Sequence, residues 1–199
     1  MTSLRKSRIV AVMKYTWPLY IISAVIVGLL LNFIFGITHR IQAYKTLTLF
    51  VSGEVSDPEK LEKHLIEKYQ DKELKSVTII SSNPNDGAYQ TRLSVAGYNT
   101  ADILIIPISK LDSIVVSSFS LELEEELINS YYPSYSVYSQ EDTKYGIKIN
   151  KETIKEYMTL PSEDCYMVLN AKSETIGEYS SSQIKERDLS LQVVKDWGI

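Results

Sequence analysis

Short β-prone runs alternate with helical patterns between residues 46 and 107, and this order constrains the fold more than any other feature. The predicted strands are "TLTLFVS" (46–52), "SVTIISS" (76–82) and "ADILIIP" (101–107). The last is apolar without alternation after Asp102, which is typical of a parallel strand buried on both faces. The order strand, helix, strand, helix, strand predicts an α/β fold whose largely parallel sheet is flanked by helices.

The two intervening helices carry their own start and stop signals. In "DPEKLEKHLIEKY", Asp57 is a predicted helix cap and Pro58 occupies the first helical position. Leucines in this segment recur at helical spacing and predict one apolar face. Tyr89 and Leu93 give the second helix an apolar face, and Gly97 is predicted to end it in a left-handed cap.

Residues 15–38 contain no charged side chain over 24 positions. At ~1.5 Å per residue a helix of this length spans about 36 Å, enough for a ~30 Å hydrocarbon layer. We therefore expect a transmembrane signal anchor, followed by a juxtamembrane linker at 39–45. The alternative is a cleaved signal peptide, whose best cleavage site would be "IQA" at 41–43.

Basic residues flank the apolar run asymmetrically. Two follow it closely, Arg40 and Lys45, whereas four precede it: Arg5, Lys6, Arg8 and Lys14. Because positive residues favour the cytoplasmic side, we expect 1–14 in the cytoplasm and the α/β domain, 46–199, outside the cell membrane. The expected protein is single-pass, with the lipid bilayer contacted through 15–38.

The segment 46–199 is acidic, with 15 basic residues against 25 acidic ones and a net charge of −10. Nucleic acid is therefore not an expected partner. Cys165 is the only cysteine of the chain, so no intrachain disulfide is possible. A free cysteine of this kind is typically a small buried hydrophobe.

The stretch "AYQTRLSVAGYNTADILIIP" (88–107) resembles the first-lobe signature of extracellular solute-binding proteins of the type 2 periplasmic-binding fold. That signature has a helix like Tyr-x-x-Lys-Leu, a small-residue glycine end, and a Pro-Asp or Ala-Asp pair that opens an apolar strand. "DTKYGIKI" (142–149) is similar to the family segment that leads into the second lobe, and 164–175 and 188–199 resemble its returning strand and closing helix. The matching positions of the first signature are Tyr89, Arg92, Leu93, Gly97, Ala101 and Asp102.

The chain departs from this family in length. Only 14 residues separate Ile149 from Asp164, too few for a second α/β lobe. The resemblance therefore implies a single truncated lobe. In the family pattern Asp102 opens a strand at the end away from the cleft, so we expect a capping or hydrogen-bonding role for it.

Ligands of open α/β sheets bind beside the carboxyl ends of the parallel strands. The loops that follow the three predicted strands would form this edge. The predicted ligand-binding residues are Ser52, Gly53, Glu54, Ser81, Ser82, Asn83, Pro107 and Ser109.

A second candidate surface is the tyrosine-rich "YYPSYSVY" (131–138). Its aromatic side chains can dock a partner or pack over a sheet. The predicted partner-binding residues are Tyr131, Tyr132, Tyr135 and Tyr138. No nucleophile elbow, Gly-rich phosphate loop or metal-ligand spacing occurs, so we expect no catalytic residues, no cofactor and no metal.

The combined prediction is a membrane-anchored, non-catalytic module, similar to solute-binding proteins, that binds a membrane protein partner within a transport or cell-surface assembly. A single lobe offers a face rather than an enclosed cavity, which disfavours small ligands. Two alternatives remain: a small-solute or glycan receptor of an ABC-type importer, and a shortened paralogue without binding activity.

Overall fold

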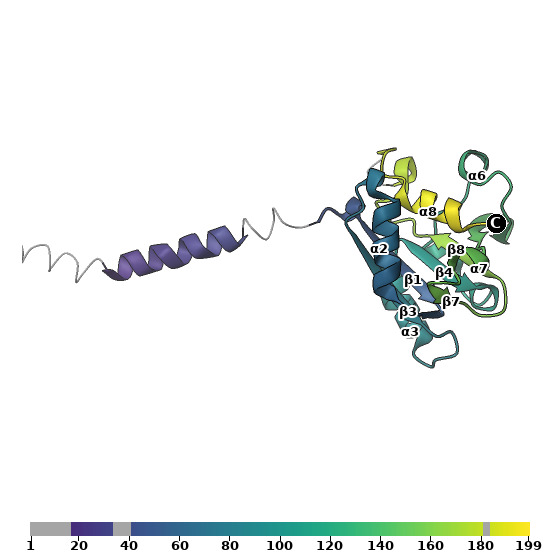
Figure 1. Cartoon of the computed structure of the whole chain (residues 1–199), viewed down its shortest axis with the longest axis horizontal. Coiled ribbons are helices and arrows are strands. Elements are labelled where there is room, and N and C mark those ends of the chain that lie inside the picture. Colours follow the sequence, from purple (N-terminus) through teal and green to yellow (C-terminus); the bar gives the residue numbers. More distant parts are fainter. Residues whose placement is uncertain (1–16, 34–40, 181–183) are drawn as a thin grey trace, which may run out of the picture. The chain divides into compact units, whose positions relative to one another are not determined.

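The computed structural model describes residues 17–33, 41–180 and 184–199. The chain divides into two compact units, Met1–Ile41 and Gln42–Ile199, and each is described by itself (Figure 1). The second unit contains the sheet and the candidate site.

The described part of the first unit is one helix over residues 17–33. No helix in the described ranges is long and apolar enough to cross a membrane. The predicted signal anchor at 15–38, the single-pass cell-membrane location and the orientation derived from it are therefore wrong. The remaining positions of that prediction, 15–16 and 34–38, and the basic segment 1–14 lie outside the described residues.

The first half of the second unit follows the predicted order closely. The strands β1 (Thr46–Ser52) and β3 (Ser76–Ser82) have the predicted bounds, and β4 (Ile103–Pro107) begins two residues later than expected. The helix α2 (Pro58–Lys68) is capped by Asp57, whose carboxylate accepts a hydrogen bond from the Lys60 N–H at 3.0 Å. Both the cap and the first-turn proline confirm the prediction.

The helix after β3 differs from its prediction at Gly97. It continues through α3 (Tyr89–Arg92), a π-helical turn η3 (Leu93–Gly97) and α4 (Tyr98–Thr100). Gly97 has φ −66° and ψ −70°, so it is right-handed and does not cap the helix. Its role is close packing, because a Cβ there would lie 2.9 Å from Leu93 Cδ1 and 3.2 Å from Leu104 Cδ2.

The main sheet is mixed rather than largely parallel. Its six strands lie in the order β3-β1-β4-β8-β6-β5. β1 pairs in parallel with β3 and β4, as predicted, but β8 (Cys165–Leu169), β6 (Thr143–Lys148) and β5 (Val137–Gln140) run antiparallel to their neighbours. An apolar run indicates that a strand is buried but not whether it runs parallel or antiparallel to its neighbour. The sequence of the second half of the chain therefore did not predict this reversal.

A second, two-stranded sheet pairs β2 (Glu54–Val55) with β7 (Met158–Thr159) in antiparallel fashion. The remaining helices are short, except for α8. They are α5 (Ile108–Leu111), α6 (Glu125–Tyr131), α7 (Lys151–Ile154) and α8 (Leu189–Trp197), with 3-10 turns at Ala43–Lys45, Gln70–Lys72, Val116–Ser118 and Gly177–Tyr179.

Both faces of the main sheet are buried, which gives a three-layer arrangement. Alternate strand residues such as Leu49 and Ile105 pack with α2, α6 and α8 in one apolar cluster. The intervening residues, such as Phe50 and Leu104, pack with the helix that contains Leu93 in the other. The helix α2 crosses one face of the sheet in Figure 1. The α/β class is confirmed.

Candidate functional site

A depression with a volume of about 320 Å³ lies at the carboxyl edge of β1, β3 and β4. We call it the carboxyl-edge depression. The loops that follow these three strands form part of its wall, and the end of β7 with the segment after it forms the rest. The lining residues are Gly53, Glu54, Asn83, Pro84, Asn85, Ser109, Lys110, Thr159, Leu160, Pro161 and Glu163.

The structure brings half of the predicted ligand-binding residues together here. Gly53, Glu54, Asn83 and Ser109 line the depression. The other four do not line it: Ser52, Ser82 and Pro107 are buried at the last positions of their strands, and Ser81 is exposed on β3. Successive side chains of a strand alternate between its faces, so neighbouring residues of one loop cannot all point to the same site.

Two buried serines and a tyrosine lie on neighbouring elements at the same edge. Ser52 and Ser82 are register partners on β1 and β3, and Ser52 Oγ lies 2.7 Å from the hydroxyl of Tyr89. Burial raises the pKa of Tyr89 to about 12, so this hydroxyl stays protonated near neutral pH. The Lys110 ammonium, which lines the depression, lies 5.6 Å from the centre of the Tyr89 ring.

Gly53 permits the close approach of two walls. A Cβ at this position would lie 2.5 Å from the carbonyl oxygen of Thr159 and 3.1 Å from Leu160 Cδ2. The absence of a side chain therefore lets β7 pair with β2 directly after the end of β1. This contact brings Thr159 and Leu160 into the wall, which sequence spacing alone did not indicate.

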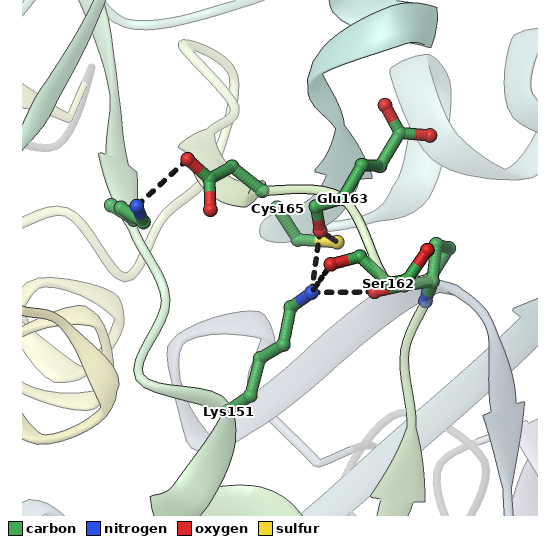
Figure 2. Close-up of polar contacts among 7 residues, drawn as sticks. Lys151, Ser162, Glu163 and Cys165 are labelled. Carbon is green, nitrogen blue, oxygen red and sulfur yellow. Dashed lines mark hydrogen bonds and ion pairs between the residues drawn. The ribbon is translucent and has the colours of Figure 1, made fainter.

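The last wall is the loop between β7 and β8. The Glu163 carboxylate accepts hydrogen bonds from the Ser109 N–H at 3.1 Å and from the Ser109 hydroxyl at 2.8 Å. The Lys151 ammonium donates to the carbonyl oxygens of Pro161, Ser162 and Glu163 at 2.5, 3.0 and 2.5 Å. Figure 2 shows the Lys151 side chain extending toward this loop. Neither Lys151 nor Glu163 was predicted, since main-chain acceptors leave no signature in the sequence.

The charges of the depression are mixed. Glu54 and Glu163 supply carboxylates, Lys110 supplies an ammonium, and amide and hydroxyl groups lie between them. No group of three or more His, Cys, Asp or Glu side chains in the described ranges is arranged to hold a metal ion. Such a lining can hold a polar group through hydrogen bonds and through both signs of charge.

Cys165 lies directly behind the loop and is 1% exposed. Its thiol donates to the Glu163 carbonyl oxygen at 3.5 Å, and burial raises its pKa to about 11. The thiolate is the nucleophilic form, so this cysteine is poorly reactive near neutral pH. Its burial confirms the predicted role as a small hydrophobe.

The four predicted partner-binding tyrosines pack largely inside the domain. Tyr132 and Tyr138 are buried, and Tyr131 and Tyr135 are half-buried. Their hydroxyls donate to Leu191 O, to Asp112 Oδ1, to Asp188 Oδ2 and to Lys195 O respectively. A partner would therefore meet only parts of Tyr131 and Tyr135, and the predicted binding role stays a prediction.

Comparison with known proteins adds no assignment. No family model matches the sequence, and no curated protein or solved structure matches it significantly. The resemblance to solute-binding proteins and the expected membrane protein partner therefore stay predictions.

Proposed function

We propose that the domain Gln42–Ile199 is a non-catalytic binding module whose carboxyl-edge depression receives a polar group of a larger partner. The observation that carries the proposal is the convergence of loops from three parallel strands on one polar depression. This edge is where open α/β sheets generally bind their ligands.

The chemistry of the lining favours binding over catalysis. The titratable side chains of the depression are Glu54, Lys110 and Glu163, and the nearby thiol and phenol have raised pKa values. General acid–base catalysis works best with a group whose pKa lies near the working pH. The carboxylate of Glu163 is already engaged by two hydrogen bonds from Ser109.

The exposure of the walls favours a large partner over an enclosed solute. Five lining residues, Glu54, Asn83, Asn85, Ser109 and Thr159, are exposed to solvent. Small-molecule sites usually bury 70–90% of a ligand's surface, in pockets of roughly 300–1,000 Å³. At about 320 Å³ the depression lies at the low end of this range, and its exposed walls suit a side chain or a chain end that stays attached to a partner.

A small-solute receptor is the second candidate, favoured by the opposite charges of Glu54 and Lys110 on the walls of one depression. A compact zwitterionic solute would match both charges. Ligand at about 100 times its dissociation constant would stabilise the fold by ~2.7 kcal/mol, which a thermal shift detects.

Site-specific cross-linking tests the proposal. A photoreactive amino acid replaces Asn85 in the full-length protein, expressed in the cells that normally make it. The matched control carries the same group at Lys172, an exposed position that lines a different pocket near Asp102. We expect one discrete adduct from position 85, none from position 172, and weaker capture when Glu54→Gln or Lys110→Met is added.

Two outcomes would contradict the proposal. Equal adducts from both positions, unaffected by the substitutions in the depression, would mean that capture is unspecific. A thermal shift of several degrees with one small solute, lost in Glu54→Gln and Lys110→Met, would replace the proposal with the receptor.

A further inference from the structure

The segment Pro161–Glu163 turns three successive carbonyl oxygens toward one ammonium. Lys151 Nζ lies 2.5 Å from Pro161 O, 3.0 Å from Ser162 O and 2.5 Å from Glu163 O (Figure 2). An ammonium has three N–H donors, so this arrangement satisfies all of them. Within the described ranges, no carboxylate lies within ion-pair distance of Lys151 Nζ.

The position of Lys151 is itself fixed. It is the first residue of α7, and Asn150 caps this helix by accepting a hydrogen bond from the Glu152 N–H at 3.1 Å. The Lys151 side chain therefore extends to the loop from a backbone that the capped helix α7 holds in place. Hydrogen bonds from a charged donor are stronger than bonds between neutral groups.

The same loop carries the contacts that shape the depression. The Ile108 N–H donates to Asp164 O at 2.9 Å, and Ser109 holds the Glu163 carboxylate through its N–H and its hydroxyl. The carbonyl of Glu163 accepts from Lys151, while its carboxylate accepts from Ser109. One residue thus links the ammonium to the wall of the depression.

We infer that Lys151 is the positioning residue of this wall: its ammonium acts as a tethered cation that gathers the three carbonyl oxygens and so sets Glu163 against Ser109. Lys151 does not line the depression and would not touch a ligand there. This inference concerns the shape of the site and stands whether or not the proposed function is correct.

The loop has a second lysine contact, which supplies a matched control. Lys148 Nζ lies 2.7 Å from Asp164 Oδ2, and the two side chains are 32% and 49% exposed. Exposed ion pairs of this kind contribute little to stability. Lys148→Met removes a positive charge next to the same loop but leaves the carbonyl cluster intact.

Cys165 is a built-in reporter of the position of the loop. It is the only cysteine of the chain, it is buried, and its thiol donates to the Glu163 carbonyl. Because the thiol is buried, we expect a soluble aromatic disulfide such as DTNB to react with it only when the loop opens. The test compares reaction rates of the full-length protein with those of Lys151→Ala, Lys151→Met and Lys148→Met.

We expect Cys165 to react about tenfold faster, or more, in both Lys151 variants and within about twofold of the native rate in Lys148→Met. Burial raises the pKa of Cys165 and the charge of Lys151 lowers it. Loss of that charge would therefore slow the reaction of a thiol whose exposure is unchanged. An acceleration consequently reports opening of the loop.

Chemical rescue separates the ammonium from general packing. Lys151→Ala lacks three methylene groups and the ammonium, which n-propylammonium supplies. We expect ~0.1 M n-propylammonium to restore most of the protection of Cys165 in Lys151→Ala, through charge-assisted hydrogen bonds to the carbonyls. Propanol, which has no charge, and tetramethylammonium, which has no N–H donor, should restore none.

Amide hydrogen exchange supplies the second measurement. The N–H groups of Ile108 and Ser109, which Lys151 does not contact, should exchange faster in both Lys151 variants, while those of the core strand residues Leu104 and Val168 keep their protection. Native reactivity of Cys165 in both variants would overturn the inference. Equal loss of protection at the core amides would also overturn it, because Lys151 would then support the whole fold. Rescue by tetramethylammonium would overturn it too, because a positive charge without an N–H donor would then suffice.

Discussion

Asp102 and Ser173 share a hydrogen bond of 2.5 Å between Oδ1 and Oγ, which joins the start of β4 to the segment after β8. The other carboxylate oxygen accepts from the Thr48 N–H at 2.7 Å. Ser173 Oγ lies 2.8 Å from Thr175 Oγ1, and this in turn lies 2.5 Å from Ser190 Oγ. The expected hydrogen-bonding role of Asp102 is confirmed, and its carboxylate ends a buried chain of hydroxyls.

This carboxylate should make stability depend on pH. Burial raises the pKa of Asp102 from 3.8 to about 6, more than its hydrogen bonds lower it. Between these values the folded state holds a proton that the unfolded state has lost, so the Asp102 contribution falls as pH rises from about 4 to 6 and is constant above. At 1.36 kcal/mol per unit, the full loss is about 3 kcal/mol.

Asp102→Asn removes this titration and can keep both contacts, because its amide oxygen can accept from Thr48 and its NH₂ can donate to Ser173. We expect the variant to match the native protein near pH 4 and to exceed it by about 2–3 kcal/mol above pH 7. Urea unfolding of both proteins across this range measures the difference. A difference that does not change with pH would contradict the raised pKa.

Gly97 should be intolerant of a methyl group. Alanine normally stabilises a helix interior by about 1 kcal/mol over glycine. Here its Cβ would lie 2.9 Å from Leu93 Cδ1, 3.2 Å from Leu104 Cδ2 and 3.6 Å from Phe50 Cγ, all in a filled core. Overpacking costs roughly 1–3 kcal/mol, so we expect Gly97→Ala to lower the free energy of unfolding by about 1–2 kcal/mol.

Gly87→Ala is the control for this substitution, because a Cβ at position 87 would meet no atom within 4 Å. Its free energy of unfolding should stay within about 0.5 kcal/mol of the native value. Equal effects of the two substitutions would show that the helix does not approach the sheet as closely as described.

The helix that contains Gly97 shows where prediction of the fold from the sequence ends. β-prone runs, a capping aspartate and a first-turn proline are local signals, and they located β1, α2 and β3 to within a residue. A glycine at the end of an apolar pattern is ambiguous, because it permits either a left-handed cap or a close approach. The neighbours Leu104 and Phe50 decide between the cap and the close approach, and they lie on the strands β4 and β1, outside the helix.

The candidate site also has a part that the sequence predicted and a part that it did not. Residues such as Glu54, Asn83 and Ser109 were predictable because parallel strands place their carboxyl ends at one edge. The wall around Glu163 was not, because it comes from a distant segment and is held through main-chain oxygens by Lys151. The predicted tyrosines had the right residue type for an interface, yet packing inside the domain leaves them little free surface.

The hairpin between β5 and β6 contains a strained turn. Its two central residues, Glu141 and Asp142, have φ values of 52° and 66°. A two-residue hairpin with both central φ values positive is a type I′ turn, which favours Asn and Gly. We expect Glu141→Asn to raise the free energy of unfolding by about 0.5–1 kcal/mol and Glu141→Val to lower it by about 1 kcal/mol. Denaturant midpoints measure both, and a stabilising valine would contradict the positive φ.

The hydroxyl of Tyr132 should matter more than that of Tyr135. Tyr132 is 0% exposed and donates to Leu191 O at 3.1 Å, whereas the half-buried Tyr135 donates to Lys195 O at 3.0 Å. Loss of a buried hydrogen bond costs about 1 kcal/mol, so Tyr132→Phe should lower the free energy of unfolding by about that amount. Tyr135→Phe should cost under about 0.5 kcal/mol. The alanine variant of Tyr132 would lose ~3–5 kcal/mol through a core cavity, so it cannot separate partner binding from folding. If the two phenylalanine variants unfold at the same urea concentration, the Tyr132 hydroxyl does not support α8.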